Sequence, residues 1–251
     1  LWSRMGDRIQ AAPKTIPSAP LTRRLWPRIV AVAASFLLLL SLFWWTQQPK
    51  TRLLAGTAER PPQSWTDGSF ARLNAGSELH WNADWTAQRA IQLEGEAFFS
   101  VAKGQPFTVQ TAEGNIEVLG TQFNVLQRAK RFEVFCYEGK VKVEKDGQAI
   151  FLEKGKGISF AIGTNRPLTK AAARPDWLDG RATFRQAALT EVFAELERQF
   201  KITLQLEANT DDRQFTGQFP HNDLTKALQL VCQPMGLSFD QRGDNIRIFE
   251  Q

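Results

Sequence analysis

The sequence has few of the residues that metal sites and disulfide frameworks require. It contains two cysteines and two histidines, Cys136, Cys232, His80 and His221, and their spacing is not that of a metal site. Both cysteines lie within apolar patterns, which favours buried free thiols, although an oxidising compartment would allow a disulfide. The sequence therefore predicts no metal site and leaves the state of the two cysteines open.

The motifs of the common catalytic classes are also missing. The sequence has no glycine-rich phosphate loop, no nucleophile elbow and no evident nucleophile–base pair. Glu94 and Glu96 flank Gly95, but in a strand both would face the same side, too close for the acid and base of a typical glycosidase. We therefore expect a protein that is not an enzyme, with no catalytic residue and no cofactor.

What the sequence does contain is one long apolar run without a charge, residues 29–45. As a helix it would reach roughly 25 Å, close to the ~30 Å hydrocarbon core of a bilayer. A buried core helix would carry a polar face, and a cleaved signal peptide would end in small residues, which residues 46–49 do not supply. We predict a membrane-spanning helix, marked by Ile29, Phe36, Leu40 and Trp45.

The charges around this run predict its direction. Lysine and arginine recur in residues 1–28, whereas only Lys50 and Arg52 follow the run closely. By the positive-inside rule the N-terminus is cytoplasmic and the rest of the chain lies across the membrane. Much of the net charge of +5 sits in this basic stub, so the charge gives no reason to expect a nucleic-acid partner.

Residues 51–162 are predicted to form an all-β domain. Turn signals such as Asp67-Gly68-Ser69 and Asp146-Gly147 recur at near-regular intervals, and apolar residues alternate with polar ones between them. No helical stripe interrupts this pattern, which favours a sandwich, a roll or a short solenoid. The aromatic residues are most simply interpreted as core: Phe98, Phe99, Phe107, Phe123, Phe132 and Phe135.

The pattern changes after this domain. Residues 163–176 are predicted to be a linker because they are rich in Gly, Asn, Pro, Ala and Arg. In residues 177–251, apolar residues recur at helical spacing from Leu189 to Phe200 and lead into a short strand, and the same plan returns from Leu224. The predicted fold class is therefore α+β multidomain: one transmembrane helix, an all-β sandwich or solenoid-like domain, and a small two-repeat helix–strand domain.

Several motifs, in order, resemble those of a known family. Residues 89–101, RAIQLEGEAFFSV, are similar to the R-x-V-x-L-x-G-E-A-F-F-x-V stretch of the FecR family of single-span sigma-factor regulators. Residues 118–125, VLGTQFNV, resemble the family's V-L-G-T-x-F-N-V. From Trp177 onward the chain looks like the family's C-terminal domain, which is similar to the short N-terminal domain of secretins and TonB-dependent receptors. The resemblance covers nearly everything after the apolar run and is to Bacteroidetes-type members.

The resemblance implies an anti-sigma factor that acts in cell-surface signalling. Such a protein is a single-pass protein of the cell inner membrane, with a cytoplasmic N-terminus and a periplasmic C-terminus. Its implied partners are an extracytoplasmic-function (ECF) sigma factor, the signalling domain of a TonB-dependent outer-membrane receptor and an intramembrane or site-1 protease. We therefore expect it to relay a signal from a TonB-dependent transporter through its periplasmic domains to transcription.

Two sets of residues are singled out for the folded part. The motif residues are interpreted as structural, with glycines at tight turns or bulges and with Thr121 and Asn124 bonded to backbone groups there. This set is Gly95, Glu96, Phe98, Gly120, Thr121, Phe123, Asn124 and Gly139. Receptor docking is predicted on edge strands of the C-terminal domain, because an exposed edge can bind a further strand. The docking set is Phe215, Gly217, Phe219, Ile246 and Ile248.

The chain departs from the family pattern in two places. Residues 65–69, WTDGS, stand where the family has L-P-D-G-S, and the turn is kept. Residues 1–28 stand where family members carry a helical sigma-binding domain, and we interpret them as the end of such a domain. Either the sequence is a fragment or this copy has lost direct control of sigma.

Two other functions are compatible with the sequence. A membrane-anchored periplasmic module could bind a glycan or an envelope polymer through surface tryptophans, and Trp65, Trp81 and Trp85 lie close together in sequence. The simpler interpretation of these three residues is core and hairpin packing. An assembly protein of the secretin kind would instead oligomerise into rings.

Overall fold

The computed structural model describes residues 30, 37, 50–55, 61–82, 84–85, 88–128, 131–161, 164–169, 173–210 and 212–251, with the backbone alone at 50–55, 161 and 164. The chain divides into two compact units, residues 1–48 and 49–251. In the first unit Val30 and Leu37 are described, and both are helical. No helix among the described residues is long and apolar enough to cross a membrane. The predicted span, with Ile29, Phe36, Leu40 and Trp45, falls almost wholly outside these residues and stays a prediction.

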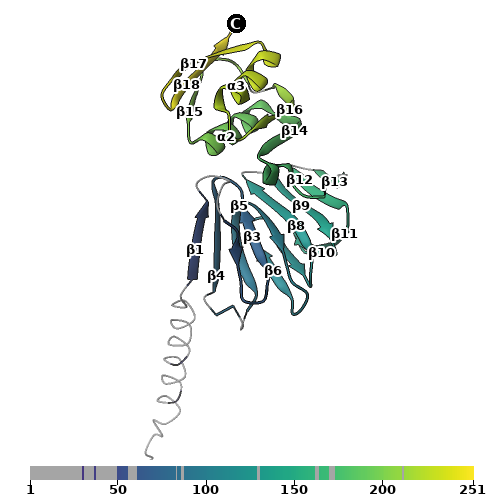
Figure 1. The fold of residues 1–251 in the computed structure, drawn as a ribbon. Coiled ribbons are helices and arrows are strands. Elements are labelled where there is room, and N and C mark those ends of the chain that lie inside the picture. Colours follow the sequence, from purple (N-terminus) through teal and green to yellow (C-terminus); the bar gives the residue numbers. More distant parts are fainter. Residues whose placement is uncertain are drawn as a thin grey trace, which may run out of the picture. The chain divides into compact units, whose positions relative to one another are not determined.

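Strands β1 to β13 form the β domain at the start of the second unit (Figure 1). They are β1 (Lys50–Ala55), β2 (Gln63–Ser64), β3 (Phe70–Leu73), β4 (Ser77–Asn82), β5 (Ala90–Ser100), β6 (Phe107–Gln110), β7 (Asn115–Val118), β8 (Gln122–Arg128), β9 (Arg131–Glu138), β10 (Lys140–Lys145), β11 (Gln148–Glu153), β12 (Lys156–Ala161) and β13 (Thr164–Thr169). The main path of pairing runs β11-β10-β7-β6-β5-β8-β9-β12-β13, and β3 and β4 also pair with β5. One curled sheet therefore makes up the domain.

Strand β5 is where the sheet curls. Its first residues, Ala90–Glu94, pair with β4 and β6, whereas Gly95–Ser100 pair with β3 and β8. The change of partners falls at Gly95, whose φ of 99° suits glycine and strains other residues. A Cβ at Gly95 would lie 2.5 Å from Ser77 Oγ and 2.8 Å from Ser77 Cα. Gly95 is therefore a corner at which one strand passes between two faces of the domain.

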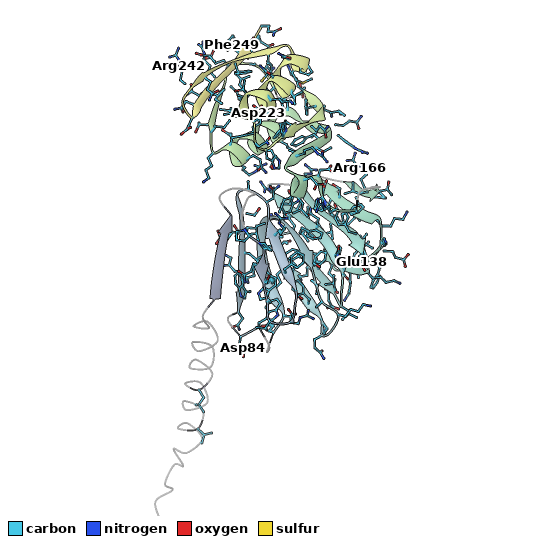
Figure 2. All side chains as sticks on the ribbon, viewed as in Figure 1. Asp84, Glu138, Arg166, Asp223, Arg242 and Phe249 are labelled. Carbon is cyan, nitrogen blue, oxygen red and sulfur yellow. The ribbon has the colours of Figure 1, made fainter. Side chains whose placement is uncertain are left out.

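A hydrophobic core lies inside the curl, where side chains from both parts of the sheet meet (Figure 2). Phe99, Phe107, Phe123 and Phe132 are among its largest fully buried members. Phe99 and Phe123 stack with their ring centroids 5.1 Å apart. Each buried phenylalanine contributes about 1.5–3 kcal/mol to folding. The structure confirms a mostly β fold with Phe99, Phe107, Phe123 and Phe132 in its core, whereas the predicted core residues Phe98 and Phe135 belong to a separate buried cluster.

The predicted linker, residues 163–176, is in part a strand. Thr164–Thr169 forms β13 and pairs antiparallel with β12 along its whole length. Because β13 is the last strand on the path, Pro167 can be accommodated there even though it has no N–H to donate. The prediction of a linker is wrong for these residues, since a Gly- and Pro-rich composition also suits an edge strand.

The C-terminal domain contains two short sheets and two α-helices within its described residues. Its elements are η1 (Asp176–Asp179), β14 (Arg181–Ala188), α2 (Leu189–Phe200), β15 (Thr203–Leu206), β16 (Gln214–Pro220), α3 (Leu224–Cys232), η2 (Gln233–Met235), β17 (Leu237–Arg242) and β18 (Asn245–Glu250). β14 pairs with β16, and β18 lies between β15 and β17. The units β14-α2-β15 and β16-α3-β17 have the same order, which confirms the predicted repeat.

Helix α2 has a buried apolar face and a second, polar face that is buried in part. The first contributes Leu189, Val192, Phe193 and Leu196 to the core of the C-terminal domain. The second carries Glu191, Glu195, Arg198 and Gln199, which are three or four residues apart and so share one side of the helix. Glu195 and Gln199 are 8% and 6% exposed. Because buried charges and amides require partners, this second face must meet polar groups from outside its own core.

Candidate functional site at the domain junction

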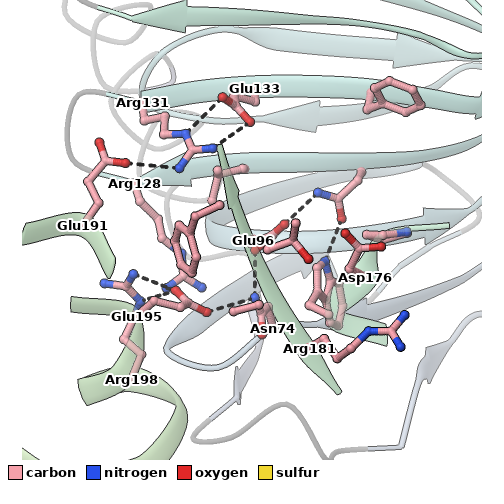
Figure 3. A pocket seen from close by; sticks show the side chains of 18 of the residues that line it. Asn74, Glu96, Arg128, Arg131, Glu133, Asp176, Arg181, Glu191, Glu195 and Arg198 are labelled. Carbon is pink, nitrogen blue, oxygen red and sulfur yellow. Dashed lines mark hydrogen bonds and ion pairs between the residues drawn. The ribbon is translucent and has the colours of Figure 1, made fainter. Parts of the chain in front are cut away.

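The second face of α2 meets the β domain at a set of residues that we call the domain junction. The β domain supplies the β3–β4 turn, Glu96 of β5 and the adjoining ends of β8 and β9, while η1 closes one side. The junction lines a cavity of about 220 Å³ (Figure 3). The residues of the junction are Asn74, Glu96, Asn124, Arg128, Arg131, Trp177, Glu191, Glu195, Arg198 and Gln199.

Glu96 is the main acceptor on the β-domain side. Its Oε2 accepts a hydrogen bond from Asn74 Nδ2 at 2.7 Å, and its Oε1 accepts one from Asn124 Nδ2 at 2.8 Å. Asn124 Oδ1 in turn accepts a bond of 3.2 Å from Trp177 Nε1. A continuous chain of hydrogen bonds thus connects η1, which we call the linker helix because it lies between the β domain and β14, with the β3–β4 turn.

Glu195 is the matching acceptor on α2. Its Oε1 accepts from Gln199 Nε2 at 2.8 Å, and its Oε2 accepts from Arg198 Nε at 3.0 Å and Nη2 at 2.7 Å. Arg128 of β8 faces the same oxygen, with Nη1 at 3.4 Å. Gln199 Nε2 also donates to Asn74 Oδ1 at 2.7 Å. Glu195 is therefore held by its own helix and by the β domain together.

The β3–β4 turn gives α2 a surface to rest on. Arg128 Nη2 donates to the carbonyl oxygen of Ala75 at 2.6 Å, which ties the turn to the Glu195 cluster. Gly76, with a φ of 63°, leaves room for Arg198, since a Cβ there would lie 3.0 Å from Arg198 Cδ. The turn therefore brings backbone close to α2 as well as reversing the chain.

The outer rim of the junction contributes less. Arg131 bonds Glu133 through two nitrogens, at 3.0 and 3.2 Å, and its Nη1 lies 3.2 Å from Glu191 Oε2. The Arg131 and Glu191 side chains are 36% and 47% exposed. An ion pair with this exposure contributes about 0–1 kcal/mol. The buried Glu195 cluster therefore accounts for most of the polar attachment.

The linker helix is attached by apolar packing. Trp177 of η1 is buried against Phe98, Phe135 and Tyr137, in a cluster separate from the main core. Neighbouring strand residues face opposite sides, so Phe99 fills the core whereas Phe98 holds the linker. Burial of a large aromatic side chain contributes on the order of 2–3 kcal/mol, which makes Trp177 a firm anchor.

The two central carboxylates have opposite electrostatic settings. Burial raises the pKa of Glu96, and the nearby charge of Glu195 raises it further, against the effect of Arg128 and the two amides. Burial also opposes ionisation of Glu195, but Arg128 and Arg198 outweigh it and hold the pKa of Glu195 below its usual value. Glu195 is therefore an anion at neutral pH, whereas Glu96 ionises less readily.

Comparison with known proteins places the two domains in one family. A family model described as FecR protein matches residues 51–142, and a second, described as FecR, C-terminal, matches residues 181–248; together they cover more than half of the chain. The chain belongs to the FecR family.

Two solved structures of a candidate anti-sigma factor from Parabacteroides distasonis resemble this FecR-family chain. The first has a TM-score of 0.72 and 26% sequence identity, and it covers 81% of this chain and 100% of the solved chain. The second has a TM-score of 0.71 and 26% identity, and it covers 80% and 99%. No curated protein gives a significant match.

Some FecR motif residues lie at a turn away from the junction. Thr121 Oγ1 donates to the carbonyl oxygen of Lys140 at 2.9 Å, so Thr121 does bond a backbone group as predicted. Gly139, with a φ of 85°, packs against Gly120, whose carbonyl oxygen would lie 2.8 Å from a Cβ at Gly139. Phe123 is a fully buried core residue. These positions fit a structural role, as interpreted from the sequence.

The other FecR motif residues belong to the junction or adjoin it. Gly95 forms the corner next to Glu96, and Phe98 packs on the linker. Asn124 lies within β8 and bonds the side chains of Glu96 and Trp177. The prediction that Asn124 satisfies backbone groups at a turn is therefore wrong. A strand residue whose neighbours are buried aromatics can reach side chains across the sheet more easily than turn backbone.

The predicted docking residues are mostly buried, and only one of their two strands lies at the edge of its sheet. Phe215, Phe219, Ile246 and Ile248 are at most 2% exposed and belong to the core of the C-terminal domain. β18 is the central strand of its sheet, so the prediction that Ile246 and Ile248 lie on an edge is wrong. β16, which carries Gly217, pairs with β14 alone among the described strands and so has a second edge. Docking itself stays a prediction.

Of the three tryptophans behind the glycan alternative, two are buried and the third is partly buried. Trp65 and Trp85 are 8% and 6% exposed, and their rings stack with centroids 4.5 Å apart. Trp81 packs against the same core. The simpler interpretation, core packing, is correct, and the alternative loses its supporting feature. Cys136 and Cys232 are both free and buried, each in the core of a different domain.

The sequence analysis missed most of the junction. The turn signal of residues 74–77 does not mark Asn74 as a junction residue, neither Arg128 nor Gln199 belongs to a motif, and Glu195 lies among the polar residues between the apolar positions of its helix. One signal was present: Glu191, Glu195 and Gln199 repeat every four residues and form a polar stripe beside the apolar one. Such a stripe is common on solvent-exposed helices, so it predicts a buried junction only once the β domain is in place.

Proposed function

We propose that this FecR-family chain regulates an ECF sigma factor by binding and passes a signal through its two folded domains. Family membership and the resemblance to the P. distasonis candidate anti-sigma factor support this function. The observation that carries it is the domain junction, where the family-motif residue Asn124 bonds the buried Trp177 of η1 and Asn74 of the β domain bonds the buried Gln199 of α2. Two modules that bind separate ligands would have no need of such a connection, whereas a relay needs one.

We further propose that the chain is a single-pass inner-membrane protein with a cytoplasmic N-terminus. The charge-free run of residues 29–45 and the basic residues before it support this placement. The β domain and the C-terminal domain would then be periplasmic, and sigma would be contacted from the N-terminal side. An intramembrane or site-1 protease would be a further partner, which would help to carry the signal across the inner membrane.

The proposed signal source is the signalling domain of a TonB-dependent outer-membrane receptor. The free edge of β16 offers main-chain N–H and C=O groups for strand addition. The side chains of Phe215 and Phe219 are buried, so main-chain bonds would supply the contact and neighbouring exposed residues its specificity.

Affinity purification of the tagged full chain from its host tests this function. We expect a sigma factor and a TonB-dependent receptor among the proteins recovered. A variant that lacks residues 177–251 should lose the receptor and retain the sigma factor, because the docking surface lies in the deleted domain. Recovery of neither partner from cells grown with and without transporter substrates would contradict the proposal.

A further inference from the structure

We propose that the domain junction is a releasable latch, in which the Glu195 cluster holds the C-terminal domain against the β domain and opening occurs about Gly180. The purpose of the latch, though not its existence, rests on the proposed function: it would give the relay a moving part. Four features of the junction lead to this proposal.

The two domains have separate cores. The apolar face of α2 packs with Phe215, Leu228 and Ile246 inside the C-terminal domain. The side chains that α2 gives to the junction are charged or amide groups apart from the small Ala194, which also lines the cavity. Separation of the domains would therefore expose polar groups to water and leave both cores intact, as is typical of movable domain interfaces.

The linker provides a fixed point and a pivot. Trp177 is anchored on the β domain by its aromatic neighbours and by its bond to Asn124. Gly180 follows directly at the end of η1, has a φ of 70°, and has no atom within 4 Å of a Cβ placed there. β14 begins at the next residue. A change of backbone angles at Gly180 would therefore swing the C-terminal domain while Trp177 stays in place.

The polar contacts of the junction require one particular arrangement of the two domains, but they contribute only a modest net free energy to holding the domains together. Glu195 and Arg128 are largely removed from water, whereas Arg198 stays partly exposed, and the attraction among the three charges offsets the cost of burial only in part. The amide bonds of Asn74 and Gln199 replace bonds to water. Such a contact is close to balance, so the closed and open forms are separated by a small free energy.

A close balance makes the junction sensitive to binding. A partner that binds the C-terminal domain more tightly when the latch is open shifts the population by its differential affinity. The opened form would present Glu191, Glu195, Arg198 and Gln199 on one side, with Asn74 and Arg128 on the other. Docking at the edge of β16 and release of α2 from the β domain would then both take place in the C-terminal domain.

Distance measurement by double electron–electron resonance on the purified full chain tests the latch. Spin labels are placed at Glu138→Cys in the β domain and Arg242→Cys in the C-terminal domain, two exposed positions (Figure 2). The native thiols are buried, and burial raises the pKa of both Cys136 and Cys232 to about 11, so they do not compete for label. We expect one dominant distance in this background.

Glu195→Gln is the variant that should open the latch. It keeps the size of the side chain and leaves Arg128 and Arg198 without their anion, which should raise the open fraction roughly tenfold or more and broaden the distance distribution. Glu207→Gln is the matched control, because Glu207 is 54% exposed and lies 3.8 Å from Arg247. The control should keep the distance of the parent.

Asn74→Ala guards against simple unfolding of the C-terminal domain. Asn74 belongs to the β domain, and its loss removes the bond to Gln199 without touching the core of the other domain. It too should broaden the distances, while hydrogen exchange at Val192 and Leu196 stays slow. An unchanged distance in both variants, or equal broadening in Glu207→Gln, would overturn the latch.

The outcome for the latch is independent of that for the proposed function. The distances are measured without sigma factor or receptor. A fixed junction would therefore refute the latch and would not affect the proposal that the chain regulates a sigma factor. Conversely, failure to recover a sigma factor from cells would remove the proposed function and leave the distance result intact.

Discussion

At the scale of single residues, the central contrast is between two glutamates that share one site. Glu96 and Glu195 both accept amide hydrogen bonds at the junction, but the arginines lie beside Glu195. Their protonation should therefore affect stability in opposite directions. Glu195 has a lowered pKa, so its contribution to folding stability is fully present above the pKa that it has in the unfolded chain. That contribution is lost as the pH falls through the pKa of Glu195 in the folded chain.

Glu96→Gln should reveal the opposite sign for Glu96. The folded pKa is raised above the reference value of 4.5, so the contribution of Glu96 is most favourable below that pH and is lost as pH rises towards the folded value. A pKa difference of one corresponds to about 1.4 kcal/mol. The melting temperature of the parent relative to Glu96→Gln should therefore fall from pH 4 to pH 8. A relative melting temperature that rises over this range would refute the assignment.

The two cysteines should behave as inert core residues. Burial raises the pKa of each thiol to about 11, so little thiolate exists at neutral pH. We expect almost no reaction with a thiol reagent in the native chain and reaction of both thiols in urea without any reductant. A native chain that yields free thiols only after reduction would show a disulfide and contradict the structure.

At the scale of elements, the sequence predicted what depends on local periodicity. The alternation around Ile91 and Val141 and the helical spacing from Leu189 to Phe200 each correspond to a strand or helix of the structure. The errors concern which element lies beside which. Composition around Pro167 cannot distinguish an edge strand from a linker, and the sequence of β18 cannot show that it is a central strand, because pairing order is a non-local property.

Gly95→Ala should show that a corner glycine differs from a turn glycine. Both Gly95 and Gly147 have positive φ, 99° and 76°, so alanine at either costs on the order of 1–2 kcal/mol. At Gly95 the new Cβ would also meet Ser77 backbone at 2.8 Å, whereas nothing lies within 4 Å at Gly147. In urea titrations, the free energy of unfolding of Gly95→Ala should be at least about 2 kcal/mol lower than that of Gly147→Ala. Equal losses would mean that the corner relaxes freely.

At the scale of the whole molecule, the motifs identified the family more readily than they located its junction. Residues 89–101 and 118–125 carry the resemblance, and the structure shows that Asn124 within them bonds Trp177 of η1, while Glu96 bonds Asn74 and Asn124 of its own domain. The bonds between the domains join residues that are distant in sequence, such as Asn74 with Gln199 and Arg128 with Glu195. No periodicity within either domain predicts a bond between domains, so this part of the site required the folded chain.

The most direct test of a sigma regulator is genome-wide transcription in a strain that lacks the gene for this chain, compared with the same strain after complementation. We predict that a small group of genes with one shared promoter element changes several-fold and returns to its former level on complementation. That group should include a TonB-dependent transporter gene. A transcript profile in which no promoter class changes under any growth condition tested would contradict the account.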